Sequence, residues 1–375
     1  MTYDTIVIGI GGMGSAAAFH LARRGLRVLA FERFALPHDL GSSHGVTRII
    51  RLAYYEHPSY VPLLRRAFAL WRDLERESGT RLLHVTGAVD AGPPGSRVFE
   101  GSRLSCEVHD LPHEVLTSAE LSRRFPAFHL PAEHLAVVQP DGGFLLPERC
   151  IETHVRLARA HGADVRTGVR VTRWEAAASG VVVHVDGETH RAPQLVVTAG
   201  PWVPSLVPTL APHLVVERQV VAWFSVTEPE HFVPGRFPVF VMNADEGHFY
   251  GFPEFGVPGF KIGKYHHRGE AVDPDRIDRA VHGEDIAPLH AFVGRYFPGG
   301  AGPLLKSSVC MFTNTPDEHF LIDRLPDAPQ VVIVSACSGH GFKFTSVIGE
   351  IVADLVQRDF TAHDIALHGL SRLPT

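Results

Sequence analysis

The N-terminal residues combine short apolar runs with a glycine-rich turn. Residues 5–8 form a run rich in β-branched side chains, which is typical of a buried parallel strand. The stretch 15–24 has the apolar periodicity of a helix that packs against a sheet, and Gly25 stands where a left-handed residue commonly ends a helix. A second apolar run covers 26–31. The order strand, helix, strand predicts a βαβ unit with glycines at its first turn.

The rest of the hydrophobic pattern predicts further helices and two kinds of strand. Short runs around a turn at Asp186-Gly187 predict a meander. Aromatic, alternating stretches between 215 and 312 predict an antiparallel sheet, whereas the patterns between 81 and 142 are shorter and rich in turns. The expected helices lie at 60–78, about 149–161 and 346–357, and the expected strands at 169–174, 181–185, 188–191, 195–198, 219–226, 247–252 and 331–334.

Three glycines at the first turn, Gly9, Gly11 and Gly14, have the G-x-G-x-x-G spacing of dinucleotide-binding proteins. The first permits a tight turn, the second lets the backbone approach a pyrophosphate, and the third lets the helix pack close to the strand. The helix N-terminus adds N–H donors and partial positive charge. Glu32 lies 18 residues after Gly14, where a carboxylate can accept hydrogen bonds from a ribose. The motif predicts FAD or NAD without distinguishing them, and Glu32 disfavours NADP because it would repel a 2′-phosphate.

Composition narrows the range of functions. Hydrophobic residues make up 45% of the 375 residues and charged residues 20%, which allows a sizeable core and excludes wholesale disorder. The net charge is −6 and no long basic run occurs, so we expect no nucleic-acid partner. The apolar runs are too short for a spanning helix, so we expect no membrane partner. The N-terminus lacks the basic region and cleavage site of a leader, which indicates a cytoplasmic protein.

Neither the cysteines nor the histidines have the spacing of a metal site. The four cysteines lie far apart, without a C-x-x-C pair, so we expect no disulfide framework. The 24 histidines include one adjacent pair, His266-His267, but no H-E-x-x-H motif. We therefore expect no bound metal. Cys106, Cys150 and Cys337 are expected to be small buried hydrophobic side chains.

Five further segments have more specific patterns: 41–51 (GSSHGVTRIIR), 250–253 (YGFP), 261–263 (KIG), 309–313 (VCMFT) and 338–344 (SGHGFKF). In this order they resemble the monomeric sarcosine oxidase and N-methyl-L-tryptophan oxidase family, within the FAD amine oxidases of the D-amino acid oxidase group. The resemblance covers nearly the whole chain. It implies a flavoprotein that oxidises the C–N bond of a secondary amino acid with O2, giving H2O2 and an imine that hydrolyses to an aldehyde and an amino acid. The expected partners are this small molecule and O2, and the protein is expected to be a monomer.

On the cofactor side, the resemblance implies that Cys310 carries FAD through a thioether to the flavin 8α-methyl group. Without that resemblance, Cys310 in its apolar run would be interpreted as a buried hydrophobic side chain. Arg48 and His44 are carried over to the flavin face, where Arg48 would favour the anionic reduced flavin; His44 alone could equally be a core histidine. The residues expected at the cofactor are Gly9, Gly11, Gly14, Glu32, Ser42, Arg48, Val171, Gly200, Cys310, Gly339, Gly341 and Lys343.

On the substrate side, Arg51 and Lys343 stand among apolar or glycine residues, where a buried charge needs a counter-ion. An amino-acid carboxylate is a suitable one, since Arg offers a planar fork and Lys a point charge. By resemblance, these two residues clamp the substrate carboxylate and Tyr250 lines the pocket. Lys261 matches the lysine at which the family reduces oxygen, where a cation stabilises superoxide as it forms. Taken alone, Lys261 would be an outward strand side chain. The expected catalytic residues are Lys261, Arg48, His44 and Tyr250.

Two positions depart from the family pattern. Tyr265 stands where the sarcosine oxidases have a histidine, four residues after the oxygen-reducing lysine. Phe312 replaces a tyrosine two residues after the flavin-linked cysteine. The lost hydroxyl removes one hydrogen bond, which typically contributes about 0.5–1.5 kcal/mol, so we expect a change in substrate preference rather than a loss of activity. The stretch 261–264 (KIGK) reads closer to the N-methyltryptophan branch.

The expected fold is a two-domain α/β protein. A Rossmann-like FAD-binding domain is expected from residues 1–80, 145–215 and 315–375. A substrate domain, built on an antiparallel sheet over the flavin, is expected from 81–144 and 216–314.

Three other functions stay open at this point. An FAD-dependent dehydrogenase of a cyclic amino acid, such as proline or pipecolate, would pass electrons to an acceptor other than oxygen, but Lys261 favours an oxidase. An NAD-dependent dehydrogenase would share the glycine motif and leave Cys310 and Lys343 unexplained. A non-enzymatic flavin-binding protein would have no need of Lys261, Arg51 and Lys343 together.

Overall fold

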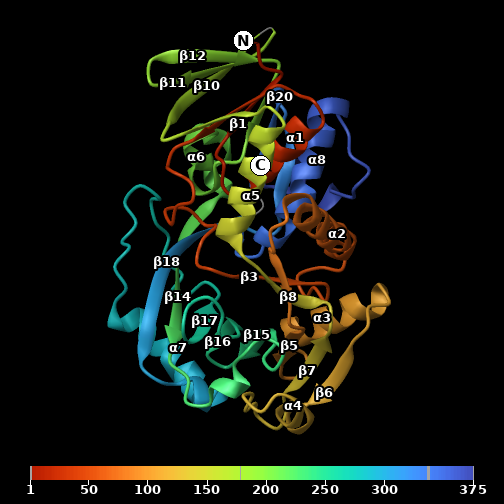
Figure 1. The fold of residues 1–375 in the computed structure, drawn as a ribbon, viewed down its shortest axis with the longest axis vertical. Helices are drawn as coiled ribbons and strands as arrows, with labels where there is room; N and C mark the ends of the chain where they lie inside the picture. Colours follow the sequence, from red (N-terminus) through yellow and green to blue (C-terminus); the bar gives the residue numbers. More distant parts are fainter. Residues whose placement is uncertain (1, 178, 336–337, 375) are drawn as a thin grey trace.

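The chain folds into two units that are stacked along the long axis of the molecule (Figure 1). The computed structural model describes residues 2–177, 179–335 and 338–374, and the statements below concern these residues. One unit holds a largely parallel sheet flanked by helices, and the other holds a large antiparallel sheet. The long strands β14 (Val215–Phe224) and β18 (Leu304–Asn314) run from the second unit toward the first.

The first unit is built on a six-stranded sheet with β1 (Thr5–Ile8) inside it. Strand β1 is fully buried and pairs in parallel with β2 (Val28–Glu32) and β13 (Gln194–Val197). Short apolar strands of this kind fit a sheet that is covered on both faces. The order is β19-β20-β13-β1-β2-β9, in which the remaining strands are β9 (Asp164–Thr167), β19 (Leu321–Leu325) and β20 (Ala328–Ser335).

Helices pack closely on this sheet because small residues face one another. Helix α1 (Gly12–Arg23) contacts both α8 (Thr345–Arg358) and α5 (Pro147–Ala160). A Cβ atom added to Gly349 of α8 would lie 2.7 Å from the backbone of Ala16, so glycine allows the two helices to approach. Helix α2 (Tyr60–Ser78) lies against α8 on the outside. A meander of β10 (Val171–Ala177), β11 (Gly180–Val185) and β12 (Glu188–Ala192) completes the unit.

The second unit is an eight-stranded sheet in which β15–β5 is the parallel pair and the other pairs are antiparallel. Phenylalanine side chains and helix α7 (Gly283–Tyr296) fill the core on one side of it. A small sheet of β3 (Arg48–Arg51), β8 (Gly142–Leu145) and β4 (Leu83–Val85) lies between the two units (Figure 1). The order of the large sheet is β18-β14-β17-β16-β15-β5-β7-β6, with β5 (Ala88–Gly92), β6 (Glu114–Thr117), β7 (Leu135–Gln139), β15 (Val239–Ala244), β16 (Gly247–Phe252) and β17 (Phe260–Lys264).

Short helices and 3₁₀ turns connect these elements. They are α3 (Arg97–Val108), α4 (Ser118–Arg124), α6 (Val203–Leu206), η1 (Gly200–Trp202), η2 (Pro208–His213), η3 (Pro229–His231), η4 (Pro298–Gly300), η5 (Phe342–Phe344), η6 (Ala366–His368) and η7 (Leu370–Arg372). None of the helices in the described ranges is both long and apolar enough to span a bilayer.

The two-unit α/β architecture agrees with the sequence prediction, while several elements differ. The helix predicted at 60–78 is α2 with the same bounds, and the turn predicted at Asp186-Gly187 joins β11 to β12. Helix α7 was not predicted: it lies inside the stretch 215–312, where we expected only strands. Strand β8 lies almost wholly in the range assigned to the substrate domain, yet it pairs with β3 of the range assigned to the FAD-binding domain. The proposed domain boundaries therefore stay a prediction.

Candidate functional site

A pocket of about 270 Å³ opens at the carboxyl ends of β1 and β2. This edge of a parallel sheet is where α/β folds bind their ligands. The meander, the 41–48 loop and the 338–344 turn form its other walls. The predicted cofactor residues that line it are Gly9, Gly11, Glu32, Ser42, Arg48, Val171, Gly200, Gly339 and Gly341.

Glycine is needed at each position of the motif for a different steric reason. Gly9 has a left-handed φ of +88°, and a Cβ there would lie 2.8 Å from the backbone of Ala199. A Cβ on Gly14 would lie 1.8 Å from the carbonyl oxygen of Gly9, so only glycine lets α1 pack on β1. At Gly11 a Cβ would meet nothing within 4 Å, because this position faces the open pocket. The space at Gly11 fits a pyrophosphate at the N-terminus of α1.

Polar groups around the pocket fit a dinucleotide. Glu32 accepts hydrogen bonds from the backbone N–H of Ile10 (2.7 Å) and Phe34 (3.0 Å), which hold its carboxylate at the end of β2. Burial would raise the pKa of Glu32, but the neighbouring His38 and these two N–H groups outweigh it and lower the pKa. The hydroxyl of Ser42 is buried without a partner among the described residues. These features fit FAD. They are the open space at Gly11, the buried hydroxyl of Ser42 and the carboxylate of Glu32.

A second cavity of about 50 Å³ adjoins this pocket. The two share Arg48, Phe312, Gly339 and Phe342 as lining residues, so they meet at these side chains. The other residues around the small cavity come from segments far apart in the sequence: Ile49, Arg51, Val241, Tyr250, Phe252, Tyr265, Cys310, His340 and Lys343. Six predicted site residues thus surround one cavity: Arg48, Arg51, Tyr250, Cys310, Gly339 and Lys343.

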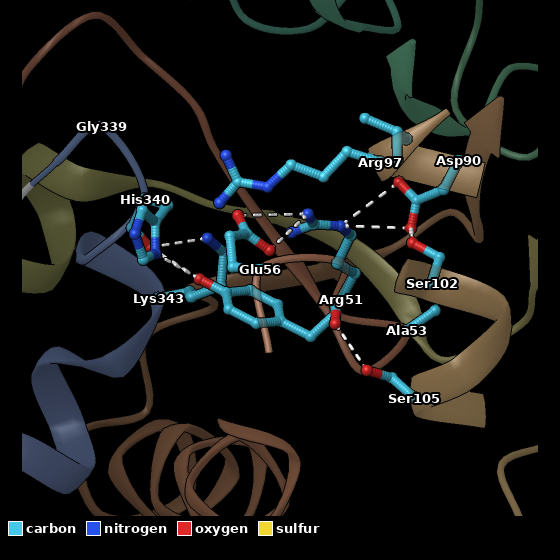
Figure 2. Close-up of polar contacts among 12 residues, drawn as sticks. Arg51, Ala53, Glu56, Asp90, Arg97, Ser102, Ser105, Gly339, His340 and Lys343 are labelled. Carbon is cyan, nitrogen blue, oxygen red and sulfur yellow. Dashed lines mark hydrogen bonds and ion pairs between the residues drawn. The ribbon is translucent and has the colours of Figure 1, made fainter. Parts of the chain in front are cut away.

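Arg51 ends strand β3 and has two carboxylate partners (Figure 2). Its Nε lies 3.3 Å from both carboxylate oxygens of Asp90, and its Nη2 lies 3.1 Å from Glu56. The guanidinium also stacks between the rings of Tyr54 and Tyr55, at 4.8 and 4.9 Å. Burial would lower the pKa of Arg51, but Glu56 and Asp90 raise it well above its usual range. Our premise that Arg51 lacks a counter-ion within the protein is wrong, because it has two.

Asp90 is itself held from a third element. It lies on β5, it is 1% exposed, and Ser102 of α3 donates a hydrogen bond of 2.7 Å to its Oδ2. Burial raises the pKa of Asp90 to about 6, although Arg51 and Ser102 oppose this shift. Figure 2 shows Asp90 joined by dashed lines to Ser102 and to Arg51, and Arg51 in turn lines the small cavity.

Lys343 occupies the 3₁₀ turn η5 on the other side of Glu56 (Figure 2). Its side chain is buried, and Nζ donates a hydrogen bond of 2.7 Å to the carbonyl oxygen of His340. Burial and the nearby Arg51 lower the pKa of Lys343 to about 7. Lys343 is therefore a cation that changes its charge near neutral pH.

Cys310 lies on β18 opposite Gln219, and its thiol is buried. Burial raises the pKa of this thiol, while Arg48 and Lys261 oppose the shift. Two predicted catalytic residues, Lys261 and His44, line neither cavity. The Nζ of Lys261 donates to the carbonyl oxygens of Gly45 (2.6 Å) and Thr47 (2.9 Å) and to the Thr47 hydroxyl (3.0 Å).

His44 is buried, and its Nε2 has no partner among the described residues. Burial and the charge of Arg48 lower the pKa of His44 to about 3, so the ring is neutral.

The two departures from the family pattern both face the small cavity. Tyr265 lines it, stacks on His248 with ring centroids 4.5 Å apart and donates to the carbonyl oxygen of Gly339 at 3.3 Å. Its neighbour His266 instead contacts Glu217 (2.7 Å) and Glu318 (2.8 Å), away from the cavity lining.

Phe312 packs on Gly339, where a Cβ would lie 2.5 Å from its ring. Phe312 and Tyr265 thus form one wall of the cavity.

Sequence reasoning missed the acidic residues of the site. Glu56 and Asp90 belong to no motif, and they come from the loop after β3 and from β5. The burial of Arg51 indicated that a partner was needed, but not which residue supplied it. Within the described ranges, no cluster of three or more His, Cys, Asp and Glu side chains has the geometry of a metal site. Cys106 and Cys150 are buried as predicted, and Cys337 falls outside the described residues.

Comparison with known proteins gives consistent results for nearly the whole chain. Residues 4–355 match the family described as FAD dependent oxidoreductase. The chain is 43% identical to a monomeric sarcosine oxidase of Streptomyces avermitilis over 381 residues, covering 99% of this chain and 98% of the relative. It is 37% identical to an N-methyl-L-tryptophan oxidase of Yersinia pestis, covering 99% and 100%. Among solved structures, NikD, described as an unusual amino acid oxidase of nikkomycin biosynthesis, superposes with a TM-score of 0.85 at 26% identity, covering 98% of this chain and 97% of NikD.

Proposed function

This chain belongs to the family of FAD-dependent oxidoreductases, and on that premise we propose that it is an oxidase of small N-methyl amino acids. One observation carries the proposal: a small cavity with two cations, Arg51 and Lys343, adjoins the dinucleotide pocket and shares Arg48 and Phe312 with it. Bound FAD supplies the ring that accepts a hydride equivalent from the substrate and passes the electrons to O2. The products are H2O2 and an imine, which water hydrolyses.

The charged side chains determine how a substrate is oriented. Arg51 and Lys343 hold the carboxylate, because the guanidinium is a planar fork and the ammonium an adjustable point charge. The amine and its methyl group then lie toward Tyr250 and Phe312, at the junction with the FAD pocket. Ring walls on this side exclude water, and no side chain here is needed as a general base.

The size of the cavity favours a compact substrate. Its volume is about 50 Å³, whereas sites for larger ligands commonly measure about 300–1,000 Å³. Tyr265 and Phe312 narrow it further, since both line it and their ring centroids are 5.7 Å apart. We therefore favour a sarcosine-like substrate over N-methyltryptophan, against the interpretation of the stretch 261–264.

Two finer features belong to the same proposal. Cys310 forms a thioether with the flavin, which is supported by its position at the small cavity and by the cations Arg48 and Lys261 beside its thiol. Lys261 stabilises negative charge on oxygen as it is reduced, since a preorganised cation acts strongly where water is excluded. The protein acts as a monomer.

The substrate assignment is tested with a panel of N-methyl amino acids, with peroxide formation as the readout. Sarcosine is expected to be oxidised faster than N-methyltryptophan. Arg51→Lys and Lys343→Met should raise KM for sarcosine and leave the weak reaction of its decarboxylated analogue, dimethylamine, nearly unchanged, because that amine has no carboxylate to bind. Equal losses for both compounds would show that the two residues do not hold a carboxylate.

The covalent link is tested by acid precipitation of the purified protein. Yellow colour is expected to stay in the pellet of the wild type and to wash out of Cys310→Ser. Cys150→Ser is the matched control, since Cys150 is equally buried but lines neither cavity. An intact mass of the wild type equal to that of the bare chain would rule out the thioether.

A further inference from the structure

The loop that carries His44 and Arg48 contains a strained turn. Gly45 and Val46 both have left-handed backbones, with φ of +96° and +73°. The N–H of Thr47 donates to the carbonyl oxygen of Gly45 at 2.8 Å, which closes a three-residue turn around Val46. Turns of this kind with a positive central φ are rare, and a β-branched residue is especially unfavourable there. Such backbone persists only where its surroundings enforce it.

One side of this turn is held by a carboxylate. Oε1 of Glu148 accepts the backbone N–H groups of Gly45 (2.7 Å) and Val46 (3.1 Å). Glu148 lies in the first turn of α5, where an acidic residue is favourable for the helix alone. Its oxygen is nevertheless directed to two N–H groups more than a hundred residues away in sequence, which helix stability does not require.

The opposite side of the turn is held by a cation. Lys261, from β17 of the other unit, donates to the carbonyl oxygens of Gly45 and Thr47 and to the Thr47 hydroxyl. Burial lowers the pKa of Lys261 well below its usual value, and the three oxygens offer acceptors for all three protons of its ammonium form. The carboxylate therefore holds the N–H groups and the ammonium holds the carbonyl oxygens of the same few residues.

The conformation of this turn determines the positions of groups at the cofactor pocket. Arg48 follows it directly, and its Nη1 and Nη2 donate to the carbonyl oxygens of Thr47 (3.0 Å) and Ser42 (2.9 Å). Arg48 and Ser42 line the pocket, and Arg48 also lines the small cavity. A turn that relaxed to ordinary backbone would move the Thr47 carbonyl oxygen and, with it, the guanidinium of Arg48.

We propose that Glu148 is a positioning residue of the flavin site, which together with Lys261 forces the 45–47 turn into the conformation that presents Arg48 to FAD. The inference rests on the proposed FAD site, and it gives Lys261 a structural task in addition to its proposed action on oxygen. Glu148 acts through its acceptor oxygen, since one oxygen receives both N–H groups.

The test measures the bound flavin of purified holoenzyme rather than turnover. Glu148→Ala is expected to lower the fraction of purified protein that carries flavin by about tenfold, the ratio that corresponds to ~1.4 kcal/mol, and to shift the flavin midpoint potential. Glu148→Gln keeps the acceptor oxygen and should stay within about twofold of the wild type. Glu152→Ala, an exposed position one turn further along α5, is the matched control and should leave both readouts unchanged.

A second substitution that restores flavin binding distinguishes positioning of the 45–47 turn from an effect of Glu148 on the stability of α5. Asparagine tolerates left-handed backbone far better than valine, so Val46→Asn should restore most of the flavin lost in Glu148→Ala. Wild-type flavin content and potential in Glu148→Ala would overturn the proposal, and so would a loss that Val46→Asn leaves uncorrected or that Glu148→Gln shares in full. Failure of the wild type to oxidise sarcosine would refute the proposed function alone, because the flavin readouts do not depend on substrate.

Discussion

At the scale of single residues, the charges around the small cavity determine what binds there. Arg51 and Lys343 supply two cations, and the carboxylates of Glu56 and Asp90 already face Arg51. A substrate carboxylate therefore competes with Glu56 for Nη2 of Arg51 unless the protein takes up a proton. Arg97 of α3 points toward Glu56 in Figure 2, while its own ion pair is with Glu318 at 3.0 Å. Binding of an anion at this cavity therefore depends on proton uptake by the protein as well as on contacts with Arg51 and Lys343.

The first prediction at this scale concerns pH. The pKa of Lys343 is lowered to about 7, so the side chain is a cation below that pH and becomes neutral above it. Because an anionic ligand favours the cation, its affinity should fall as pH rises through 7, by about tenfold per pH unit, until the raised pKa of the complex is reached. The measurement is a spectral titration of the flavin with acetate, which has no amine to titrate.

Lys343→Met is the control for this titration. It should bind acetate weakly and with little dependence on pH near 7, and the dependence that stays would reflect Asp90, whose pKa is about 6. An unaltered pH profile in Lys343→Met would show that Lys343 does not bind the carboxylate.

The positions of residues that belong to a sequence motif could be predicted, whereas the residues that contact them in the fold could not. Cys310 and Tyr250 were placed at one cavity because their neighbours along the chain form specific patterns. Asp90 and Glu148 have no such pattern, since their role depends on which strand or helix lies beside β3 and its loop. Lys261 was predicted as a site residue from the resemblance alone, and its three oxygen acceptors come from a loop more than two hundred residues away.

At the scale of elements, the glycine turn shows how local sequence sets structure. The βαβ unit was predictable because its apolar periods and glycines agree with one another. Helix α7 was not, since Pro288 and Gly294 inside it weaken its helical signal and its neighbours are strand-rich. Strand β3 was also not predicted, because only two apolar residues lie between Arg48 and Arg51 and give a weak strand pattern.

A matched pair of variants separates the packing role of the glycines from their cofactor role. Gly14→Ala places a Cβ 1.8 Å from the Gly9 carbonyl oxygen, so the free energy of unfolding of flavin-free protein should fall by about 1–3 kcal/mol or more. Gly11→Ala meets nothing within 4 Å and has a φ of −71°, so that protein should keep its stability and lose FAD affinity. Urea unfolding and flavin titration measure the two effects. Similar loss of stability in both variants would contradict the separate roles.

At the scale of the whole molecule, residues 271–282 link the two units. Asp275 in this segment accepts hydrogen bonds from Arg33 (2.5 Å) and from the indole of Trp202 (2.8 Å), and both donors line the FAD pocket. Arg279 donates to the carbonyl oxygens of Asp39 and Leu40. In Figure 1 this stretch is part of the loop that extends beside β14 and β18 toward the first unit. The segment thus holds two side chains of the pocket wall in place.

We expect Asp275→Ala to change flavin exchange more than stability. Exposed ion pairs typically contribute about 0–1 kcal/mol, so Tm should move little. In the Cys310→Ser background, release of FAD should become faster, because the pocket is opened where Arg33 and Trp202 lie. Stopped-flow dilution of the loaded protein, with the fluorescence of released FAD as the readout, measures the rate. Glu284→Ala, whose ion pair with Arg268 lies within the second unit, is the control, and equal rates in both would show that Asp275 does not hold the pocket wall.

The separate locations of the glycine motif and Cys310 have a mechanical consequence. The motif belongs to the six-stranded sheet, whereas Cys310 lies on β18 of the eight-stranded sheet. With the thioether in place as proposed, one prosthetic group is anchored in both units and acts as a cross-link between them. Like a disulfide, such a link reduces the freedom of the unfolded chain, and the effect grows with the length of the loop it closes. Flavin attachment would then couple the unfolding of the two sheets, so that the redox cofactor would also stabilise the fold.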